Sequence, residues 1–139
     1  MRNVQLRTAR CLLIAATCCA AMSTPDAYAR STVQRDVEGY AIASCLASQD
    51  QPYLKDQGDG WASVIVQRGK GGLEALTAVA AAVKAELAKG DMAVIHSEEG
   101  PMKDKPLPVM YCSEIIDTPS VHAAINNAVK KLAPSYRGH

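Results

Sequence analysis

Two cysteines, with acidic residues beside one of them, are the part of the sequence best suited to chemistry. Cys112 lies in the stretch YCSEIIDTP, where Glu114 and Asp117 follow it closely. A cysteine acts as a nucleophile when it is a thiolate with a base nearby. It can equally form half of a structural disulfide. The compartment in which the protein folds decides between these uses, because disulfides persist in oxidising surroundings.

The N-terminal segment predicts export. A basic start with three arginines precedes the apolar run CLLIAATCCAAM (11–22), and AYA (27–29) has the small-x-small form of a signal peptidase site. This three-part pattern is typical of a secretory signal peptide. An apolar run of about twelve residues is too short to cross a bilayer core as a helix. We therefore expect residues 1–29 to be a signal peptide cleaved after Ala29, which leaves residues 30–139 as the exported domain.

The exported domain is small and nearly neutral. Three of the 15 basic residues and one of the 14 acidic residues lie in the signal segment, which leaves 12 against 13. We therefore expect no nucleic acid partner and no membrane insertion after signal cleavage. About 110 residues suffice for one domain with its own core. Because the sequence contains no Phe, the interior is expected to consist of Ala, Val, Leu and Ile around Trp61 and a few Tyr.

The cysteine count favours a disulfide. Three of the five cysteines lie in the signal segment, so Cys45 and Cys112 remain. In an oxidising compartment an even count implies pairing, and two cysteines allow one intrachain connectivity. The chain-entropy model gives a bridge with so long a loop about 4 kcal/mol. We interpret Cys112 as half of a bridge, with Glu114 and Asp117 as a solvated face or cap. The nucleophile interpretation requires a free thiol.

The first half of the exported chain predicts helices separated by turns. Small and apolar residues recur at steps of three and four over 35–48, which places Cys45 on the buried stripe of the first helix. The polar segment 49–60 contains one proline and two glycines, and we interpret it as a turn region with at most one short helical turn. Residues 60–69 are ambiguous between strand and helix, and the absence of a convincing partner strand nearby favours helix.

The second half predicts three more helices. An apolar stripe over 73–89 is followed by Gly90 as a natural C-cap. A short helix is expected over 109–117, and Thr118 with Pro119 is a favourable start for the last helix, which Pro134 is expected to end. The predicted fold is therefore a small all-α domain of four to six helices. One disulfide is expected to join its first helix to the penultimate one.

The segment 91–108 differs from the rest of the chain. It is long and charged, and Gly100 and three prolines interrupt it. A short strand is possible over 92–96, and the remainder is expected to be an exposed loop. Loops of this length inside a compact domain are uncommon and are usually functional or disordered.

Other constellations that could support catalysis are weak. The histidines His96, His122 and His139 are widely separated and match no metal-binding spacing. The GKGG stretch lacks the spacing of a phosphate-binding loop. Glu98 and Glu99 are adjacent, so they do not form a pair of facing carboxylates. We predict a binding protein rather than an enzyme, with no catalytic residues, no metal and no cofactor.

Several fragments together resemble a known family. They are SCLASQDQPYLKDQGDGWASVIVQR (44–68), PLPVMYCSEIIDTP (106–119) and KKLAPSY (130–136). Their order is similar to that of the immunity proteins of type VI secretion amidase effectors, specifically the fourth effector–immunity family. The resemblance covers most of residues 36–136.

The resemblance implies a function. Members of that family are periplasmic all-helical proteins, commonly homodimers, that bind a papain-like peptidoglycan amidase and block its active-site cleft with a protruding loop. In this chain the segment 91–108 is the expected plug. The residues expected to contact the amidase are His96, Ser97, Glu98, Glu99, Met102, Lys103 and Asp104. The Ala-rich stripe over 73–89 could serve either the core or a partner helix.

Three other interpretations remain open. The protein could inhibit a different periplasmic hydrolase, such as a lysozyme or a protease. It could be a small structural or ligand-binding module of the cell envelope. It could also be a cysteine hydrolase, provided that Cys112 is free and reactive.

Overall fold

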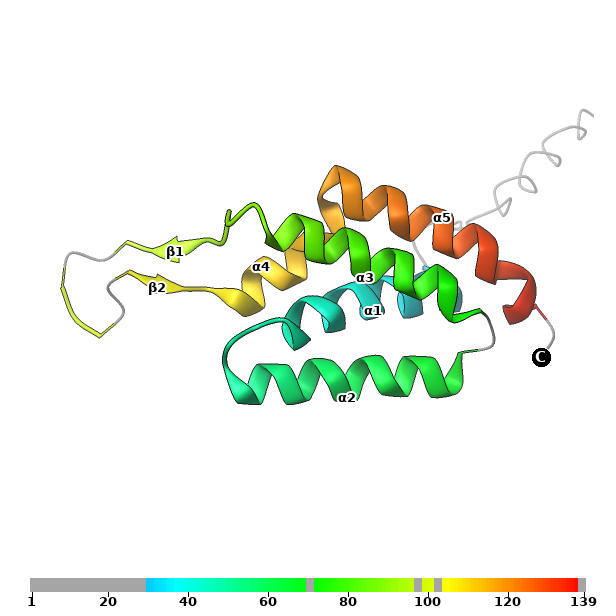
Figure 1. Ribbon diagram of the computed structural model, residues 1–139, viewed down its shortest axis with the longest axis horizontal. Helices are drawn as coiled ribbons and strands as arrows, with labels where there is room; N and C mark the ends of the chain where they lie inside the picture. Colours follow the sequence, from blue (N-terminus) through cyan, green and yellow to red (C-terminus); the bar gives the residue numbers. More distant parts are fainter. Residues whose placement is uncertain (1–29, 70–71, 97–98, 102–103, 138–139) are drawn as a thin grey trace, which may run out of the picture.

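The computed structural model describes residues 30–69, 72–96, 99–101 and 104–137, so the predicted signal segment lies outside the described residues. The elements in chain order are α1 (Thr32–Ala47), α2 (Pro52–Arg68), α3 (Leu73–Leu87), β1 (Val94–Ile95), β2 (Lys105–Pro106), α4 (Pro108–Glu114), the 3₁₀ helix η1 (Ile115–Asp117) and α5 (Pro119–Tyr136). The helices form one body, from which the two short strands extend (Figure 1). The prediction of a small all-α domain is confirmed. No helix in the described ranges is both long and apolar enough to span a membrane.

Helix α1 is the central element of the helical body. It packs against α2, α3, α4 and α5, and its Val37, Ala41 and Cys45 are completely buried. The Ser31 hydroxyl caps its first turn by accepting a hydrogen bond from the N–H of Gln34. The core is completed by aliphatic residues of α3, η1 and α5, namely Leu76, Val79, Val83, Ile115, Val121, Ile125, Ala128 and Leu132. The apolar spacing that predicted these helices is the spacing that fills the core.

Trp61 does not lie at the centre of this core. Its side chain is 41% exposed, so the expectation of an interior built around Trp61 is wrong. The indole lies over Gly39, because a Cβ atom placed there would be 3.2 Å from Cζ2 of Trp61. Trp61 therefore covers the contact between α1 and α2 from the outside, while Ile65 beside it is buried.

The expected turn region 49–60 is wrong for most of its length. Helix α2 begins at Pro52 and continues through Gly58 and Gly60. Pro52 lies in the first turn, where the missing N–H has no helical partner to lose. Gly58 is buried against α1, and a Cβ atom there would be 2.3 Å from the backbone N of Ala47. The glycine that suggested a turn therefore permits close packing of two helix backbones.

The predicted helices after α2 are present with adjusted ends. Helix α3 ends at Leu87 and its C-cap is Ala88, so the prediction of Gly90 as the C-cap is wrong by two residues. Gly90 still takes the left-handed conformation after the helix, with a φ of 78°. Of the stripe predicted for this helix, Leu76 and Val83 lie in the core, Ala80 and Leu87 are half-buried, and Leu73 is 59% exposed. The short helix expected over 109–117 is present in two parts, α4 and η1.

The last helix begins where predicted and ends later than predicted. Thr118 occupies the N-cap and Pro119 the first helical position of α5. The expected end at Pro134 is wrong, because the helix continues to Tyr136. A proline so near the end removes only one backbone donor from the last turn. The hydroxyl of Tyr136 is also bonded to Asp36 on α1, which holds this turn against the body.

Candidate functional site

The segment between α3 and α4 forms a β-hairpin, which we call the hairpin and define as residues 91–107. Its strands β1 and β2 are antiparallel, with Val94 opposite Pro106 and Ile95 opposite Lys105. At its base the N–H of Leu107 donates to the carbonyl of Ala93 at 2.9 Å. Figure 1 shows the hairpin projecting beyond one end of the helical body. The loop expected from the sequence, with a short strand in its first part, therefore has a second strand as well.

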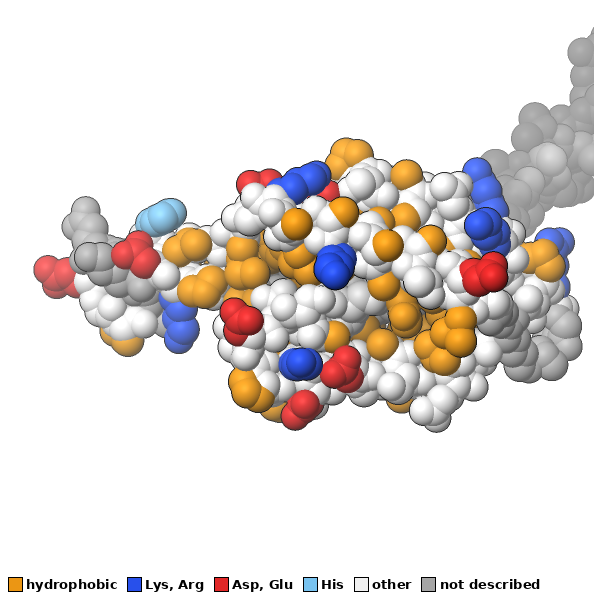
Figure 2. Space-filling model, in the orientation of Figure 1, with side chains coloured by type: hydrophobic (Ala, Val, Ile, Leu, Met, Phe, Trp, Pro, Cys, Tyr) orange, Lys and Arg blue, Asp and Glu red, His pale blue; other side chains and the backbone are white. Residues whose placement is uncertain are grey.

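Apolar side chains lie near the base of the hairpin. Val94 is 37% exposed on β1, and Val109 and Met110 are exposed on the adjoining α4. Leu107 between them is half-buried. Figure 2 shows apolar side chains gathered where the hairpin meets the helical body. A partner that received the hairpin would meet this apolar surface after the outer part had entered.

The outer part of the hairpin is polar. The Nδ1 atom of His96 is 3.5 Å from Oδ1 of Asp104, and both side chains are largely exposed. Asp104 has a φ of 50° and Gly100 a φ of 93°, so the chain reverses through two left-handed positions. Glu99 is also exposed. Of the residues expected to contact a partner, these three charged or titratable side chains are therefore at the surface of the projecting segment.

The other residues expected in the plug, Ser97, Glu98, Met102 and Lys103, lie outside the described residues. Their placement in the amidase cleft stays a prediction from the sequence.

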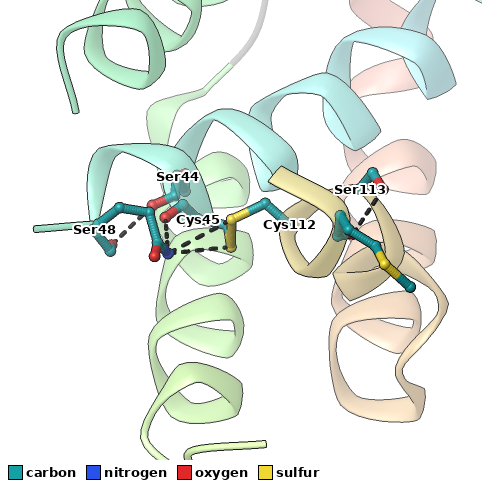
Figure 3. Close-up of a disulfide and its surroundings, with 7 residues drawn as sticks. Ser44, Cys45, Ser48, Cys112 and Ser113 are labelled. Carbon is teal, nitrogen blue, oxygen red and sulfur yellow. Dashed lines mark hydrogen bonds between the residues drawn. A yellow bond between two sulfur atoms is a disulfide. The ribbon is translucent and has the colours of Figure 1, made fainter. Parts of the chain in front are cut away.

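A disulfide secures the base of the hairpin. The Sγ atom of Cys45 on α1 is bonded to that of Cys112 on α4, and the two Cα atoms are 5.5 Å apart (Figure 3). Helix α4 begins at Pro108, directly beyond the hairpin. The bridge therefore ties the element that follows the hairpin to the central helix. Both cysteines are completely buried, and the predicted pairing is confirmed, so Cys112 is not a free thiol.

The carboxamide of Gln49 covers the disulfide. Its Nε2 donates to the carbonyl of Cys45 at 2.9 Å and lies 3.6 Å from the Sγ of Cys112. Gln49 is only 8% exposed. The sequence assigned Gln49 to a polar turn, and no spacing signal indicated that its side chain would be buried against the bridge.

A buried carboxylate joins three helices at the end of the body away from the hairpin. Asp36 on α1 is 4% exposed and accepts hydrogen bonds from the guanidinium of Arg68 on α2 and the hydroxyl of Tyr136 on α5. Burial, together with the hydrogen bond to Asp36, raises the pKa of Tyr136 to about 12. The three side chains bond to one another across α1, α2 and α5, so this cluster ties the three helices together.

A second carboxylate joins α3 to α5. Glu86 is 8% exposed, and its Oε2 accepts from Nζ of Lys89 at 2.7 Å and from Oγ of Ser120 at 2.6 Å. The hydrogen bond from Lys89, followed by that from Ser120, lowers the pKa of Glu86, and the same contact with Glu86 raises the pKa of Lys89. Ser120 lies in the first turn of α5, where a carboxylate also complements the helix dipole. Sequence spacing predicted neither cluster.

The remaining candidates for chemistry do not converge. His122 lies on α5 beside Asn126, with 3.3 Å between the side-chain nitrogens, and His139 lies outside the described residues. Within the described ranges, no group of three or more His, Cys, Asp or Glu side chains is arranged to hold a metal ion. Glu114 and Asp117 are exposed, as expected for a solvated face.

Comparison of the chain with protein-family models, with curated proteins and with solved structures finds no match. The candidate site is therefore defined by geometry. It is a hairpin that projects from a helical body, polar in its outer part and apolar at its base, and the helix α4 that follows it is bridged to the central helix. Such an arrangement can enter a cleft on another molecule.

Proposed function

We propose that this protein is a periplasmic immunity protein that binds a type VI-secreted peptidoglycan amidase. The hairpin enters the active-site cleft of the amidase and prevents hydrolysis of the cell wall. In this proposal the catalytic residues belong to the amidase, and this chain acts by occlusion. Residues 1–29 direct the chain to the periplasm, where the injected amidase acts.

The projection of the hairpin is the observation that carries the proposal. An inhibitor that blocks a cleft needs a segment that stands clear of its own body, and the hairpin is such a segment (Figure 1). His96, Glu99 and Asp104 offer polar groups that can form hydrogen bonds inside a cleft. Val94, Val109 and Met110 at the base are exposed and can bury apolar area against its rim.

The anchoring of the hairpin supports the same function. Binding is weakened when a loop must lose conformational freedom at the interface, and preorganisation reduces that cost. The disulfide between Cys45 and Cys112 restrains α4 at one side of the hairpin. The hydrogen bond from Leu107 to Ala93 closes its base. The hairpin is thus presented from a fixed base, as a plug requires.

The family resemblance also implies a homodimer, and we propose one as part of this function. On α3, Ala75, Val79 and Val83 face the core, whereas Ala78, Ala81 and Ala85 are exposed. Helix α2 exposes larger apolar side chains, including Tyr53 and Val64, and we assign the dimer interface to it. Sedimentation velocity of the wild type and of Val64→Glu tests this assignment. A dimer that dissociates in the variant supports it, and a wild-type monomer or an unaffected dimer contradicts it.

An inhibition assay tests the proposal. Purified amidases of the fourth effector family are incubated with peptidoglycan stem peptides, with and without the exported domain, residues 30–139. The wild type is expected to abolish hydrolysis by at least one amidase at a stoichiometric ratio. A variant with residues 96–104 replaced by a Gly/Ser linker is expected to lose inhibition. Lys130→Ala, an exposed change on α5, is the matched control and should inhibit fully.

The same assay separates the alternatives. Inhibition of a lysozyme or a periplasmic protease, with none of the amidases affected, would contradict the amidase assignment and favour a different hydrolase inhibitor. Inhibition that survives the loop replacement would contradict the assignment of the hairpin as the plug.

A further inference from the structure

The two edges of the hairpin differ in what they can offer to another strand. The hydrogen bond from Leu107 to Ala93 makes these residues a hydrogen-bonded pair of the antiparallel ladder. Such pairs alternate with non-hydrogen-bonded pairs. In the register of β1 and β2, Val94 and Pro106 therefore form a non-hydrogen-bonded pair. The backbone polar groups of both residues point away from the partner strand, towards the outer edges of the hairpin.

The outer edge of β2 is closed to pairing by proline. Pro106 has no N–H, and it occupies the position whose N–H would otherwise point outwards. Pro108, two residues further on and the first residue of α4, lacks an N–H as well. Asp104, two residues before Pro106, has a φ of 50° and departs from the extended conformation. Proline at an edge is a recognised block to strand addition.

The outer edge of β1 carries no such block. The outward residue of β1 is Val94; Met92 and His96 take the alternate positions just outside the strand, and none of the three is a proline. Val94 is 37% exposed, and its N–H and C=O point to the outside by the alternation described above. No hydrogen bond of the Val94 backbone to another described residue outside the ladder is present. The hairpin therefore has one edge that can receive an extended chain.

We infer that the outer edge of β1 pairs with an extended backbone segment in the wall of the amidase cleft. This inference rests on the proposed function, and it names the main-chain contact between the hairpin and the amidase. In the proposed function the amidase cleft receives the peptide stems of peptidoglycan, and a free strand edge offers the same backbone donors and acceptors as an extended peptide. Strand addition of this kind takes its affinity from main-chain hydrogen bonds. Val94 is its central residue.

A second copy of this chain is a poorer occupant. The edge offers only Val94 and the alternate positions 92 and 96, whereas a stable interface buries roughly 800 Å² on each partner. Pairing of two such short edges provides only a small part of this area. A cleft, in contrast, encloses the hairpin on several sides, so the edge contributes to a larger interface that includes the apolar base.

Substitution of Val94 isolates the backbone donor. Val94→Pro removes the outward N–H and introduces a ring at the edge, while the inward hydrogen bonds of Ala93 and Ile95 stay possible, as they do opposite Pro106. Val94→Ala is the matched control, because it shortens the side chain and keeps the N–H. We expect Val94→Pro to bind the inhibited amidase at least about tenfold more weakly than Val94→Ala. Amide exchange at Leu107, whose N–H bonds to Ala93, reports whether the hairpin stays paired.

Amide hydrogen exchange of the wild type gives a second readout. In the free protein the Val94 amide should exchange faster than that of Leu107, and in the amidase complex it should become protected. Equal affinity of Val94→Pro and Val94→Ala, with an unprotected Val94 amide in the complex, would overturn this inference alone. Failure of the wild type to bind any amidase would overturn the proposed function, and this inference with it. Protection of Val94 that appears on self-association would instead assign the edge to a second copy.

Discussion

The hydroxyl of Tyr136 donates a 3.0 Å hydrogen bond to Oδ2 of Asp36, which joins residues 100 positions apart in the sequence. Arg68 bonds the other carboxylate oxygen, so the end of α5, the end of α2 and the start of α1 meet at one buried acid. The contact holds the last turn of α5 past Pro134. It fastens the end of the body away from the hairpin, as the disulfide fastens the other.

Tyr136→Phe should lower the free energy of unfolding by about 1–2 kcal/mol at neutral pH, because a hydrogen bond to a buried carboxylate is lost. The pKa of Tyr136 is raised to about 12, so the folded state favours the neutral hydroxyl. The stabilisation of the fold by the Tyr136 hydroxyl is complete below the unfolded pKa near 10 and is lost as the pH rises through the folded pKa of about 12. Urea unfolding between pH 7 and 12 should therefore show an alkaline decline that is smaller in Tyr136→Phe. An equal decline in both proteins would contradict this role.

A pair of glycine substitutions tests the close packing of α1 and α2. Gly58→Ala places a Cβ atom 2.3 Å from the backbone N of Ala47, so we expect a loss of about 2–3 kcal/mol or more. Gly60→Ala has no atom within 4 Å of the new Cβ, so it should stabilise the helix by about 0.5–1 kcal/mol. Thermal unfolding of the two variants measures the difference. Similar melting temperatures would mean that the backbones are not in contact at Gly58.

The contact of Glu86 with Lys89 and Ser120 predicts that the free energy of unfolding decreases in acid. Its pKa is lowered from the ordinary 4.5, so the stabilisation is present above pH 4.5 and is lost as the pH falls through the folded pKa. Glu86→Gln should weaken the decline in stability below pH 4.5, and Ser120→Ala should weaken it in part. Urea midpoints from pH 2 to 7 provide the measurement. An unchanged acid decline in Glu86→Gln would assign the decline to other carboxyl groups.

Removal of the disulfide should destabilise the fold. The bridge spans a sequence separation of 67 residues, so the double change Cys45→Ala and Cys112→Ala is expected to cost about 2–4 kcal/mol. The double change alters no residue of the hairpin, so below its melting temperature the variant should still bind the amidase. Binding should be weaker than that of the wild type, because α4 is less restrained. Calorimetry and a binding titration measure the two effects. An unchanged melting temperature would mean that the bridge does not contribute to stability.

The sequence predicted the parts of the fold that follow from apolar periodicity and from cysteine pairing. The stripes on α1, α3 and α5 are local patterns, and two cysteines have one possible intrachain connectivity. The start of α5 was equally local, since Thr118 and Pro119 favour a helix N-terminus by their own conformation. The helix features depend on residues that lie close together in the sequence. The disulfide spans a separation of 67 residues, and it was predictable because only two cysteines lie outside the predicted signal segment.

The errors arose where tertiary contacts override local preference. Gly58 and Gly60 suggested a turn, but Gly58 is fixed in a helix because α1 approaches it closely. Pro134 suggested a helix end, but α5 continues to Tyr136, whose hydroxyl is hydrogen-bonded to Asp36 and holds the last turn in place. In the hairpin, the second strand contains a proline and was not predicted. The strand can form because the register points the nitrogen of Pro106 away from β1, so the missing N–H removes no hydrogen bond between the strands.

The most direct test of the central claim is a protection assay in a test bacterium. An amidase of the fourth effector family is directed to the periplasm, and lysis is followed by turbidity with and without this protein. We expect the full chain to prevent lysis. Removal of residues 1–29 should abolish protection, and replacement of residues 96–104 by a Gly/Ser linker should abolish it too. Lysis that the full chain does not prevent, against every amidase of the panel and with both proteins detected in the periplasm, would contradict the account.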